Sequence, residues 1–240
     1  MRLTNVRTIG VGAIALVVVF YAAGNAQASG TNEKYPKMAP AEQYLMADRL
    51  EEIALARTAA PGSISHDAEI LVLGRHGYET AVKGKNGFGC LVERAWNAGF
   101  ESTEFWNPKI RGPVCYNPAA ARSLLPLVLE RAKLALAGLT KAQIMDSTTA
   151  ATTRKFNPAL EPGAVCYMMS KEAYLTDDGS HNLAHLMFYT SAIEAAALGA
   201  DVPGSPVIMG RQGIPGAPSP VTEFYVRVPK WSDGTPATGQ

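Results

Sequence analysis

The sequence predicts an α+β fold in which a single antiparallel or mixed sheet carries helices packed on one side. Short apolar or alternating segments typical of strands form two groups, one within residues 68–95 and one after residue 164. A helical region separates these groups, and another helix precedes them. The pattern contains no repeated strand–helix–strand units, which disfavours a doubly wound parallel sheet.

The N-terminus has the three parts of a secretory signal peptide. Arg2 and Arg7 form a basic region, residues 9–23 are an uncharged run of 15 residues, and Ala26-Gln27-Ala28 supplies the small-x-small pattern that precedes a cut. A membrane-spanning helix needs about 20 residues, so the run is short for an anchor. An uncleaved anchor is the alternative. We expect cleavage after residue 28 and a periplasmic or extracellular protein that no longer touches the membrane.

The remaining chain is expected to divide into three segments. Residues 29–38 are polar and predict a flexible leader after cleavage. Residues 39–231 are expected to form the single α+β domain, and residues 232–240 a frayed tail. The domain opens with a predicted helix over residues 40–59, which starts at Pro40 and ends before Pro61.

Strand signals follow this helix. Residues 68–73 are a short apolar run, and Arg75-His76-Gly77 is typical of a tight turn. Residues 78–83 and 88–95 flank an Asn86-Gly87 pair, which predicts a hairpin because both turn positions need positive φ. Glu79 would face Arg94 in that hairpin.

The middle of the chain predicts helices. Asn117 can cap a helix that extends to Ala137, with a kink or a late start at Pro126. Thr140 and Gln143 form a capping-box pattern that opens a second helix, and the Ser/Thr-rich residues 147–153 are expected to end it. Late strands are predicted at residues 164–169, 186–189, 207–209 and 221–228.

Export changes how the three cysteines are interpreted. An oxidising compartment favours one disulfide and one remaining thiol among Cys90, Cys115 and Cys166. We favour Cys90–Cys115, because the irregular residues 97–117 need a tether, and the closed loop of about 25 residues could stabilise the fold by roughly 3 kcal/mol. Cys115–Cys166 is the alternative pairing. A catalytic cysteine is disfavoured because no nucleophile signature surrounds any of the three.

Charge narrows the classes of partner. Formal net charge is +1, and the chain after residue 28 carries 20 basic and 21 acidic residues. Such a balance argues against nucleic acid or an anionic membrane surface as the main partner.

One short segment has the composition of a metal site. Asp177, Asp178, His181 and His185 bring two carboxylates and two imidazoles within nine residues, and these are usual ligands of zinc and other divalent metals. The HExxH pattern is missing, since Asn182 follows the first histidine. A polar turn leading into a buried strand is the favoured interpretation. A divalent metal site and acid–base catalysis by a histidine are the alternatives, and no other cofactor is expected.

Aromatic side chains gather in the irregular stretch. Trp96, Phe100, Phe105 and Trp106 could line a ligand cleft or fill the edge of the core, and the second is favoured.

Several short segments resemble a set of exported bacterial proteins without an assigned activity. They are Gly77-Tyr78-Glu79, residues 86–94 without position 89 (NGFxCLVER), Pro113-Val114-Cys115-Tyr116 and residues 185–189 (HLMFY). The resemblance covers roughly residues 65–190. It implies a single exported domain and no catalytic residues.

Taken together, these observations predict an exported, noncatalytic binding or interaction protein, whose partner is a small molecule or a protein. No complete catalytic motif is present, although enzymatic activity stays open. The alternative is a small exported hydrolase, with or without the help of a metal ion, that uses Asp177, Asp178, His181 and His185.

Overall fold

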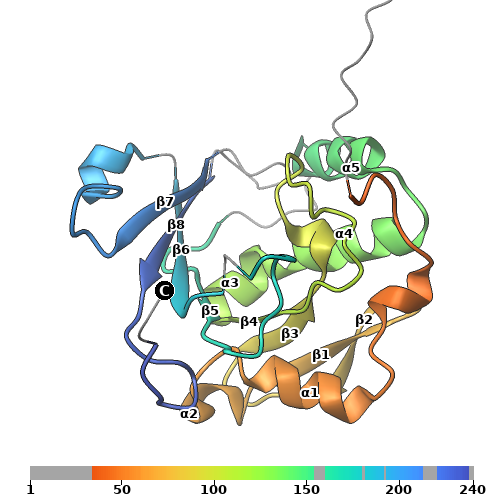
Figure 1. The fold of residues 1–240 in the computed structure, drawn as a ribbon, viewed down its shortest axis with the longest axis horizontal. Coiled ribbons are helices and arrows are strands. Elements are labelled where there is room, and N and C mark those ends of the chain that lie inside the picture. Colours follow the sequence, from red (N-terminus) through yellow and green to blue (C-terminus); the bar gives the residue numbers. More distant parts are fainter. Residues whose placement is uncertain (1–33, 154–159, 180–181, 192, 213–220, 238–240) are drawn as a thin grey trace, which may run out of the picture. The chain divides into compact units, whose positions relative to one another are not determined.

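One mixed sheet organises the chain. The computed structural model describes residues 34–153, 160–179, 182–191, 193–212 and 221–237. Within these residues eight strands pair in the order β2-β1-β3-β4-β5-β6-β8-β7 (Figure 1). Neighbours are antiparallel except β1 and β3, which are parallel. The strands are β1 Glu69–Gly74, β2 Gly77–Val82, β3 Gly89–Glu93, β4 Gly112–Tyr116, β5 Val165–Met168, β6 His185–Ser191, β7 Val207–Gln212 and β8 Val221–Arg227. The single mixed sheet of an α+β fold is confirmed.

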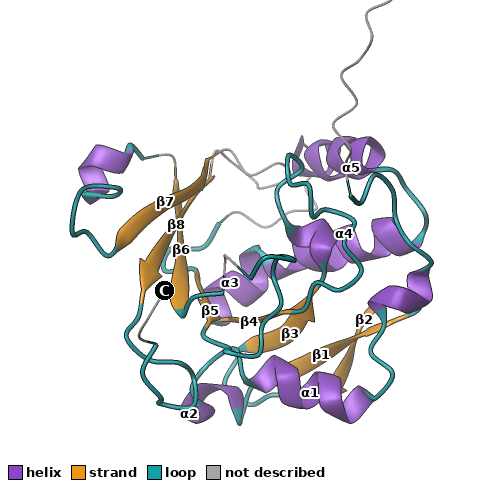
Figure 2. Cartoon of the chain, viewed as in Figure 1, coloured by secondary structure: helices purple, strands orange, loops and turns teal. Residues whose placement is uncertain are grey.

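Five α-helices and three short 3-10 helices accompany the sheet in the described residues (Figure 2). The α-helices are α1 Arg49–Arg57, α2 Gly62–Ser65, α3 Pro118–Ser123, α4 Leu125–Leu136 and α5 Lys141–Thr153. The 3-10 helices are η1 Ala41–Tyr44, η2 Ala95–Asn97 and η3 Ala195–Leu198. None of the described helices has both the length and the apolar character that a membrane span requires.

Helices cover both faces of the sheet rather than the one side expected. α1 packs against β1, β3 and β4 and buries Ile70, Cys90 and Val92. On the opposite face, α3 and α4 pack over Leu71 and Leu91. Figure 1 shows α1 and α4 on opposite sides of the strands. The sequence carries the reason: β1 is a continuous apolar run, and such runs are typical of strands buried on both faces.

The predicted hairpin between the second and third strand segments is wrong. β2 pairs with β1 through the tight turn at Arg75-His76, as the turn residues predicted, and β3 then adds to the other edge of β1. The connection after β2 passes over the start of β1, so closely that a Cβ on Gly84 would lie 2.2 Å from the Glu69 nitrogen. Gly87 does take a positive φ of 76°, but in a crossover rather than a hairpin.

The predicted first helix is shorter than expected. η1 comes first, and α1 begins only after Asp48, whose carboxylate accepts a hydrogen bond from the Leu50 amide. An N-terminal cap of this kind offsets the loss of backbone partners at a helix start.

The middle helices follow the sequence more closely. The break at Pro126 is confirmed, because α3 ends at Ser123 and α4 restarts around the proline. The capping box is confirmed by hydrogen bonds between Thr140 and Gln143. The second helix, α5, runs to Thr153, the last residue of the Ser/Thr-rich segment expected to end it, and the Thr148 hydroxyl donates back to the Ile144 carbonyl.

Packing and hydrogen bonds extend beyond both predicted ends of the domain. Tyr35 and Met38, placed in the flexible leader, pack against the aromatic core described below. In the expected tail, Ser232 donates a backbone hydrogen bond to Met169, and Ala237 donates one to Pro229. The described residues therefore hold structure outside the 39–231 boundaries.

Candidate functional site

A cleft of about 980 Å³ lies over the sheet face that carries α3 and α4. Its floor is the part of that face formed by β5, β6 and β8, and its walls come from α4 and from two long loops. The floor residues on these three strands are Met168, His185, Met187, Tyr189, Glu223, Tyr225 and Arg227.

Strand alternation decides which side chains reach this floor. In the β6–β8 ladder Met187 lies opposite Tyr225, and Tyr189 lies opposite Glu223. Successive side chains on a strand point to opposite faces, so every second residue of β6 and β8 faces the cleft. Phe188 and Phe224, between them, stack on the other face with ring centroids 5.5 Å apart.

Two carboxylates of the cleft lining, one on the floor and one at the end of β3, are each held by a tyrosine. The Tyr189 hydroxyl donates to Glu223 at 3.2 Å, and the Tyr116 hydroxyl donates to Glu93 at the end of β3. Glu223 is fully buried. Burial and the neighbouring Glu93 hold the pKa of Tyr116 well above its usual value, so this hydroxyl stays protonated as a donor.

The first wall combines α4 with the loop after β3. Leu127 and Val128 present apolar side chains to the cleft, and Arg131 lies one turn further along the helix. The Arg131 guanidinium lies 4.5 Å from the centre of the Phe100 ring and donates to the Ala98 carbonyl at 3.4 Å. This arginine therefore holds the 97–104 loop against α4.

The opposite wall is the loop between β5 and β6. Leu175, Thr176 and Asp178 line the cleft, while the side chain of Asp177 has its polar contacts elsewhere. Asp177 accepts hydrogen bonds from Lys34, from the Tyr35 hydroxyl at 2.8 Å and from the Tyr174 hydroxyl at 2.7 Å.

Asp177 also contacts residues 107–109, which follow the loop of the first wall. It accepts from Asn107 at 3.3 Å and from the Lys109 ammonium at 3.4 Å. Hydrogen bonds from Lys34, Tyr174 and Tyr35 hold the pKa of this carboxyl well below its usual range. Asp177 thus joins the N-terminal segment, the 107–109 loop and the 174–178 loop.

The described residues of the predicted metal site each have other contacts in this arrangement. Asp177 is occupied by cations and hydroxyls, and Asp178 accepts from the Thr176 hydroxyl at 2.5 Å. His185 is buried on the cleft floor, where its Nδ1 lies 2.7 Å from the Leu183 carbonyl and its ring packs edge-on to Tyr225. Burial lowers the pKa of His185, which favours the neutral imidazole.

His181 lies outside the described residues. Across the described ranges, no three histidine, cysteine or acidic side chains are grouped so that they could hold a metal ion. The four-residue metal site therefore stays a prediction.

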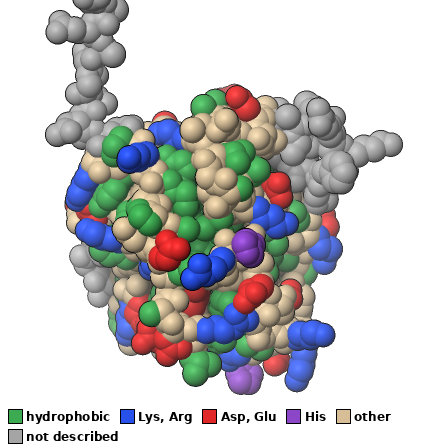
Figure 3. All heavy atoms as spheres, turned by 90° about the vertical axis from the view of Figure 1, so that its right-hand side faces the viewer, with side chains coloured by type: hydrophobic (Ala, Val, Ile, Leu, Met, Phe, Trp, Pro, Cys, Tyr) green, Lys and Arg blue, Asp and Glu red, His purple; other side chains and the backbone are tan. Residues whose placement is uncertain are grey.

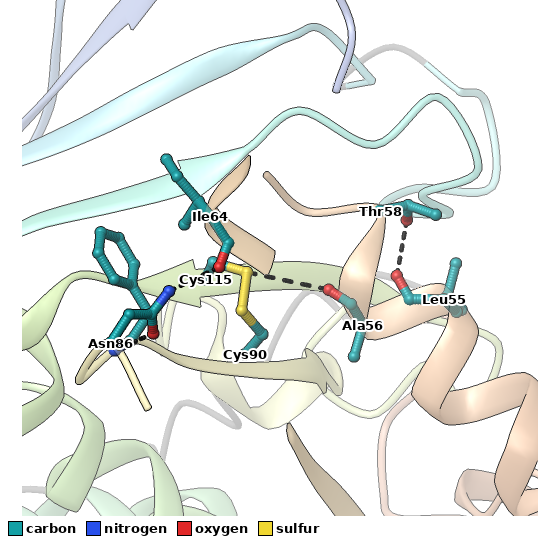
Figure 4. The surroundings of a disulfide bond; sticks show 8 residues. Leu55, Ala56, Thr58, Ile64, Asn86, Cys90 and Cys115 are labelled. Atoms are coloured by element: carbon teal, nitrogen blue, oxygen red, sulfur yellow. Dashed lines mark hydrogen bonds between the residues drawn. A yellow bond between two sulfur atoms is a disulfide. The ribbon is translucent and has the colours of Figure 1, made fainter. Parts of the chain in front are cut away.

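The Cys90–Cys115 disulfide is present, as predicted. The two cysteines are direct partners in the β3–β4 ladder, with Cα atoms 4.0 Å apart (Figure 4). The bond therefore links neighbouring strands under α1, where the Cys115 sulfur lies 4.0 Å from the Ala56 carbonyl oxygen.

Cys166 is not in a disulfide and is fully buried. In the β4–β5 ladder it lies opposite Tyr116, and Cys115 lies opposite Tyr167. Cys115 and Cys166 consequently face opposite sides of the sheet, which excludes the alternative pairing. Burial, together with the charges of Glu93 and Glu223, raises the pKa of the Cys166 thiol well above its usual value.

A buried ion pair lies next to the end of β3. Arg94 donates to the Glu52 carboxylate at 2.8 Å and to the Tyr44 carbonyl at 2.7 Å. Both charged side chains are at most 2% exposed. Glu79, expected to face Arg94, pairs instead with Arg49 on the surface.

The aromatic residues of the 97–117 stretch fill the core, which confirms the favoured interpretation. Trp96, Phe105 and Trp106 are buried with Tyr44 in an aromatic core beneath α4 and α5. Phe105 and Trp106 meet edge to face, with ring centroids 4.7 Å apart. The loop that carries them still lines the cleft with residues 97–104.

Sequence reasoning missed Glu93, Tyr189 and Glu223. A signal was available for Glu223: in the alternating residues 221–227 (VTEFYVR) it shares one face with Val221 and Tyr225. A carboxylate among apolar residues of one strand face indicates a buried polar group. Glu93 and Tyr189 carry no comparable local signal.

Charge on the outside is mixed. Figure 3 shows acidic and basic side chains interspersed over one face of the described residues, with apolar side chains between them.

Comparisons with models of protein families, with curated proteins and with solved structures found no significant match to this chain.

Proposed function

We propose that this protein is an exported, noncatalytic binding protein that holds an amphipathic small molecule in the cleft over β5, β6 and β8. The observation that carries the proposal is the cleft itself. Its volume of about 980 Å³ lies within the range of ligand sites, which is about 300–1,000 Å³. Apolar side chains line much of it, and a few buried polar groups converge on its floor, as in ligand sites generally.

The floor is built on rigid elements. β6 is hydrogen-bonded to β5 on one side and to β8 on the other, so the side chains of Met187 and Tyr189 are fixed by a ladder on each edge. A floor of this kind does not have to reorganise when a ligand enters, which lowers the cost of binding.

Export is part of the proposal. The Cys90–Cys115 disulfide supports it, because such bonds persist in oxidising compartments. The predicted signal peptide of residues 1–28 supports the same location.

The experiment is a titration of the mature protein with Nile red, a neutral dye that fluoresces in apolar sites. We expect saturable binding of one dye molecule. Met187→Trp, which places an indole on the cleft floor, should weaken dye binding at least tenfold.

Phe188→Trp is the matched control, since it changes the next residue of the same strand on the opposite face. Leu127→Trp obstructs the cleft independently from α4. Circular dichroism and thermal melting show that each variant is folded. Equal dye affinity in all of the folded variants would refute the cleft as the binding site.

A further inference from the structure

We propose that the ligand carries a hydroxyl group on an apolar body, and that this hydroxyl donates a hydrogen bond to Nε2 of His185 on the cleft floor. This inference rests on the proposed function and adds the chemical class of the ligand. Three observations support it: the hydrogen bond that fixes the tautomer of the imidazole, the second ring nitrogen without a partner among the described residues, and the side chains around the ring.

The tautomer of His185 follows from its one contact with the backbone. Nδ1 lies 2.7 Å from the Leu183 carbonyl oxygen, and a carbonyl oxygen can only accept, so Nδ1 carries the ring proton. Burial lowers the pKa of His185, so the ring holds a single proton at neutral pH. Nε2 is therefore unprotonated, and its lone pair is a hydrogen-bond acceptor.

This acceptor is presented to the cleft. His185, Met187 and Tyr189 alternate along one side of β6, and all three line the cleft. Nε2 is the ring nitrogen farther from the backbone, so it lies toward the cleft end of the side chain. His185 is only 6% exposed, and no group of the described residues forms a hydrogen bond with its Nε2. A donor on a ligand would supply the partner that a buried acceptor requires.

The surroundings of the ring favour a neutral donor. Met168 lies opposite His185 on β5, and the Tyr225 ring packs edge-on with its centroid 5.2 Å away. The charged neighbours are on β8, where Arg227 lies opposite His185 and Glu223 lies four residues away. A ligand cation would lose its hydration here for a neutral acceptor beside a like charge, and a carboxylate has no proton to donate. A hydroxyl avoids both costs.

The rest of the lining fits an apolar body. Met187 and Ile208 line the cleft from β6 and β7, and Leu127 and Val128 line it from α4. Burial of an apolar group against these side chains supplies affinity without direction. The hydrogen bond to Nε2 then orients the polar end, so the class of ligand is an apolar alcohol or phenol.

Displacement of Nile red by two probes of equal size tests the inference. They are 2-phenylethanol and propylbenzene, which differ by a hydroxyl in place of a methyl group. The quantity measured is the ratio of alcohol affinity to hydrocarbon affinity. His185→Phe keeps a ring of similar size without the acceptor, so this ratio should fall about tenfold. 2-Phenylethylamine is a third probe, and a larger loss of its affinity than of the alcohol's would overturn the neutral class.

Two further variants separate the acceptor from the shape of the side chain. In His185→Gln the amide oxygen can reach the place of Nε2, so the ratio should return to within about threefold of the wild type. His76→Phe is the matched control, because it makes the same change at an exposed turn outside the cleft and should leave the ratio unchanged. If His185→Phe does not fold, His185→Asn carries the test, since its side chain is too short to reach that place.

Nitrogen-15 NMR of the imidazole gives a readout that does not depend on affinity. In the free protein Nδ1 should be protonated and Nε2 should not. The Nε2 resonance should move upfield when 2-phenylethanol saturates the cleft, and propylbenzene should leave it in place. A protonated Nε2 in the free protein at neutral pH would overturn the inference.

The outcomes distinguish this inference from the proposed function. An unchanged ratio in a folded His185→Phe variant, or a loss that His185→Gln does not restore, would refute the hydroxyl site while Nile red binding stands. Absence of Nile red binding in the wild type would instead refute the cleft as a binding site.

Discussion

At the residue scale, one buried ion pair and one partly exposed carboxylate hold the parts of this fold in different ways. Glu52 and Arg94 are buried and bridge α1 to the end of β3. Asp177 lies near the surface and joins three segments through hydrogen bonds. Because the Glu52–Arg94 pair is buried, removal of either partner destabilises the fold. The hydrogen bonds of Asp177 depend instead on the ionisation of its carboxyl.

The buried pair predicts a large loss of stability on neutralising one partner. Glu52→Gln leaves Arg94 buried without its counter-charge, so the free energy of unfolding should fall by about 3–5 kcal/mol. The exposed pair Arg49–Glu79 provides the control, because Glu79→Gln should cost less than about 1 kcal/mol. Urea unfolding measures both variants. A Glu52→Gln loss no larger than that of Glu79→Gln would contradict the expectation.

Asp177 predicts a dependence of stability on acid. The pKa of this carboxyl is lowered in the folded protein, so the unfolded chain takes up its proton first, below about pH 4. The stabilisation is therefore complete above that pH and is lost as the pH falls further. Thermal melting between pH 5 and pH 2 should show a shallower decline for Asp177→Asn than for the wild type. Asp178→Asn is the neighbouring control, and equal slopes for the wild type and Asp177→Asn would disprove this role.

At the scale of elements, the disulfide reinforces a pair of strands that are already hydrogen-bonded. It was predicted as a tether for the irregular residues between β3 and β4, and it closes a separation of 25 residues. In the structure the same loop is also held by Trp96, Phe105 and Trp106 in the aromatic core. The disulfide therefore links two strands whose connecting loop is already packed into the aromatic core.

Thiol counting tests this arrangement. The native oxidised protein should react with no iodoacetamide, because Cys166 is buried and its pKa is raised. Unfolding without reductant should expose one thiol, and unfolding with reductant should expose three. Reduction should also lower the free energy of unfolding by roughly 3 kcal/mol in the chain-entropy model. Alkylation of Cys90 before reduction would show that the predicted bond does not form.

At the scale of the whole molecule, the expected cut leaves the described contacts in place. Cleavage after residue 28 keeps Lys34 and Tyr35, which bind Asp177, in the mature chain.

Intact mass and N-terminal sequencing of the protein from an exported fraction provide the test. We expect a chain that begins at Ser29 and contains the Cys90–Cys115 bond. Recovery of the full chain from Met1, with all three cysteines reduced, would refute both the signal peptide and the proposed location.

The amino-acid sequence by itself determined the local features of this protein. Proline at residue 126 breaks the helix because it removes a backbone donor, and the Thr140–Gln143 capping box forms from side chains three residues apart. The tertiary structure alone decided that β3 adds to β1 rather than to β2, although the Asn86-Gly87 pair favours a hairpin. Likewise, only the sheet order β3-β4-β5-β6-β8 places Glu93, Tyr189 and Glu223 in the lining of one cleft. Pairing between distant strands depends on which faces can be buried together, and no local pattern contains that information.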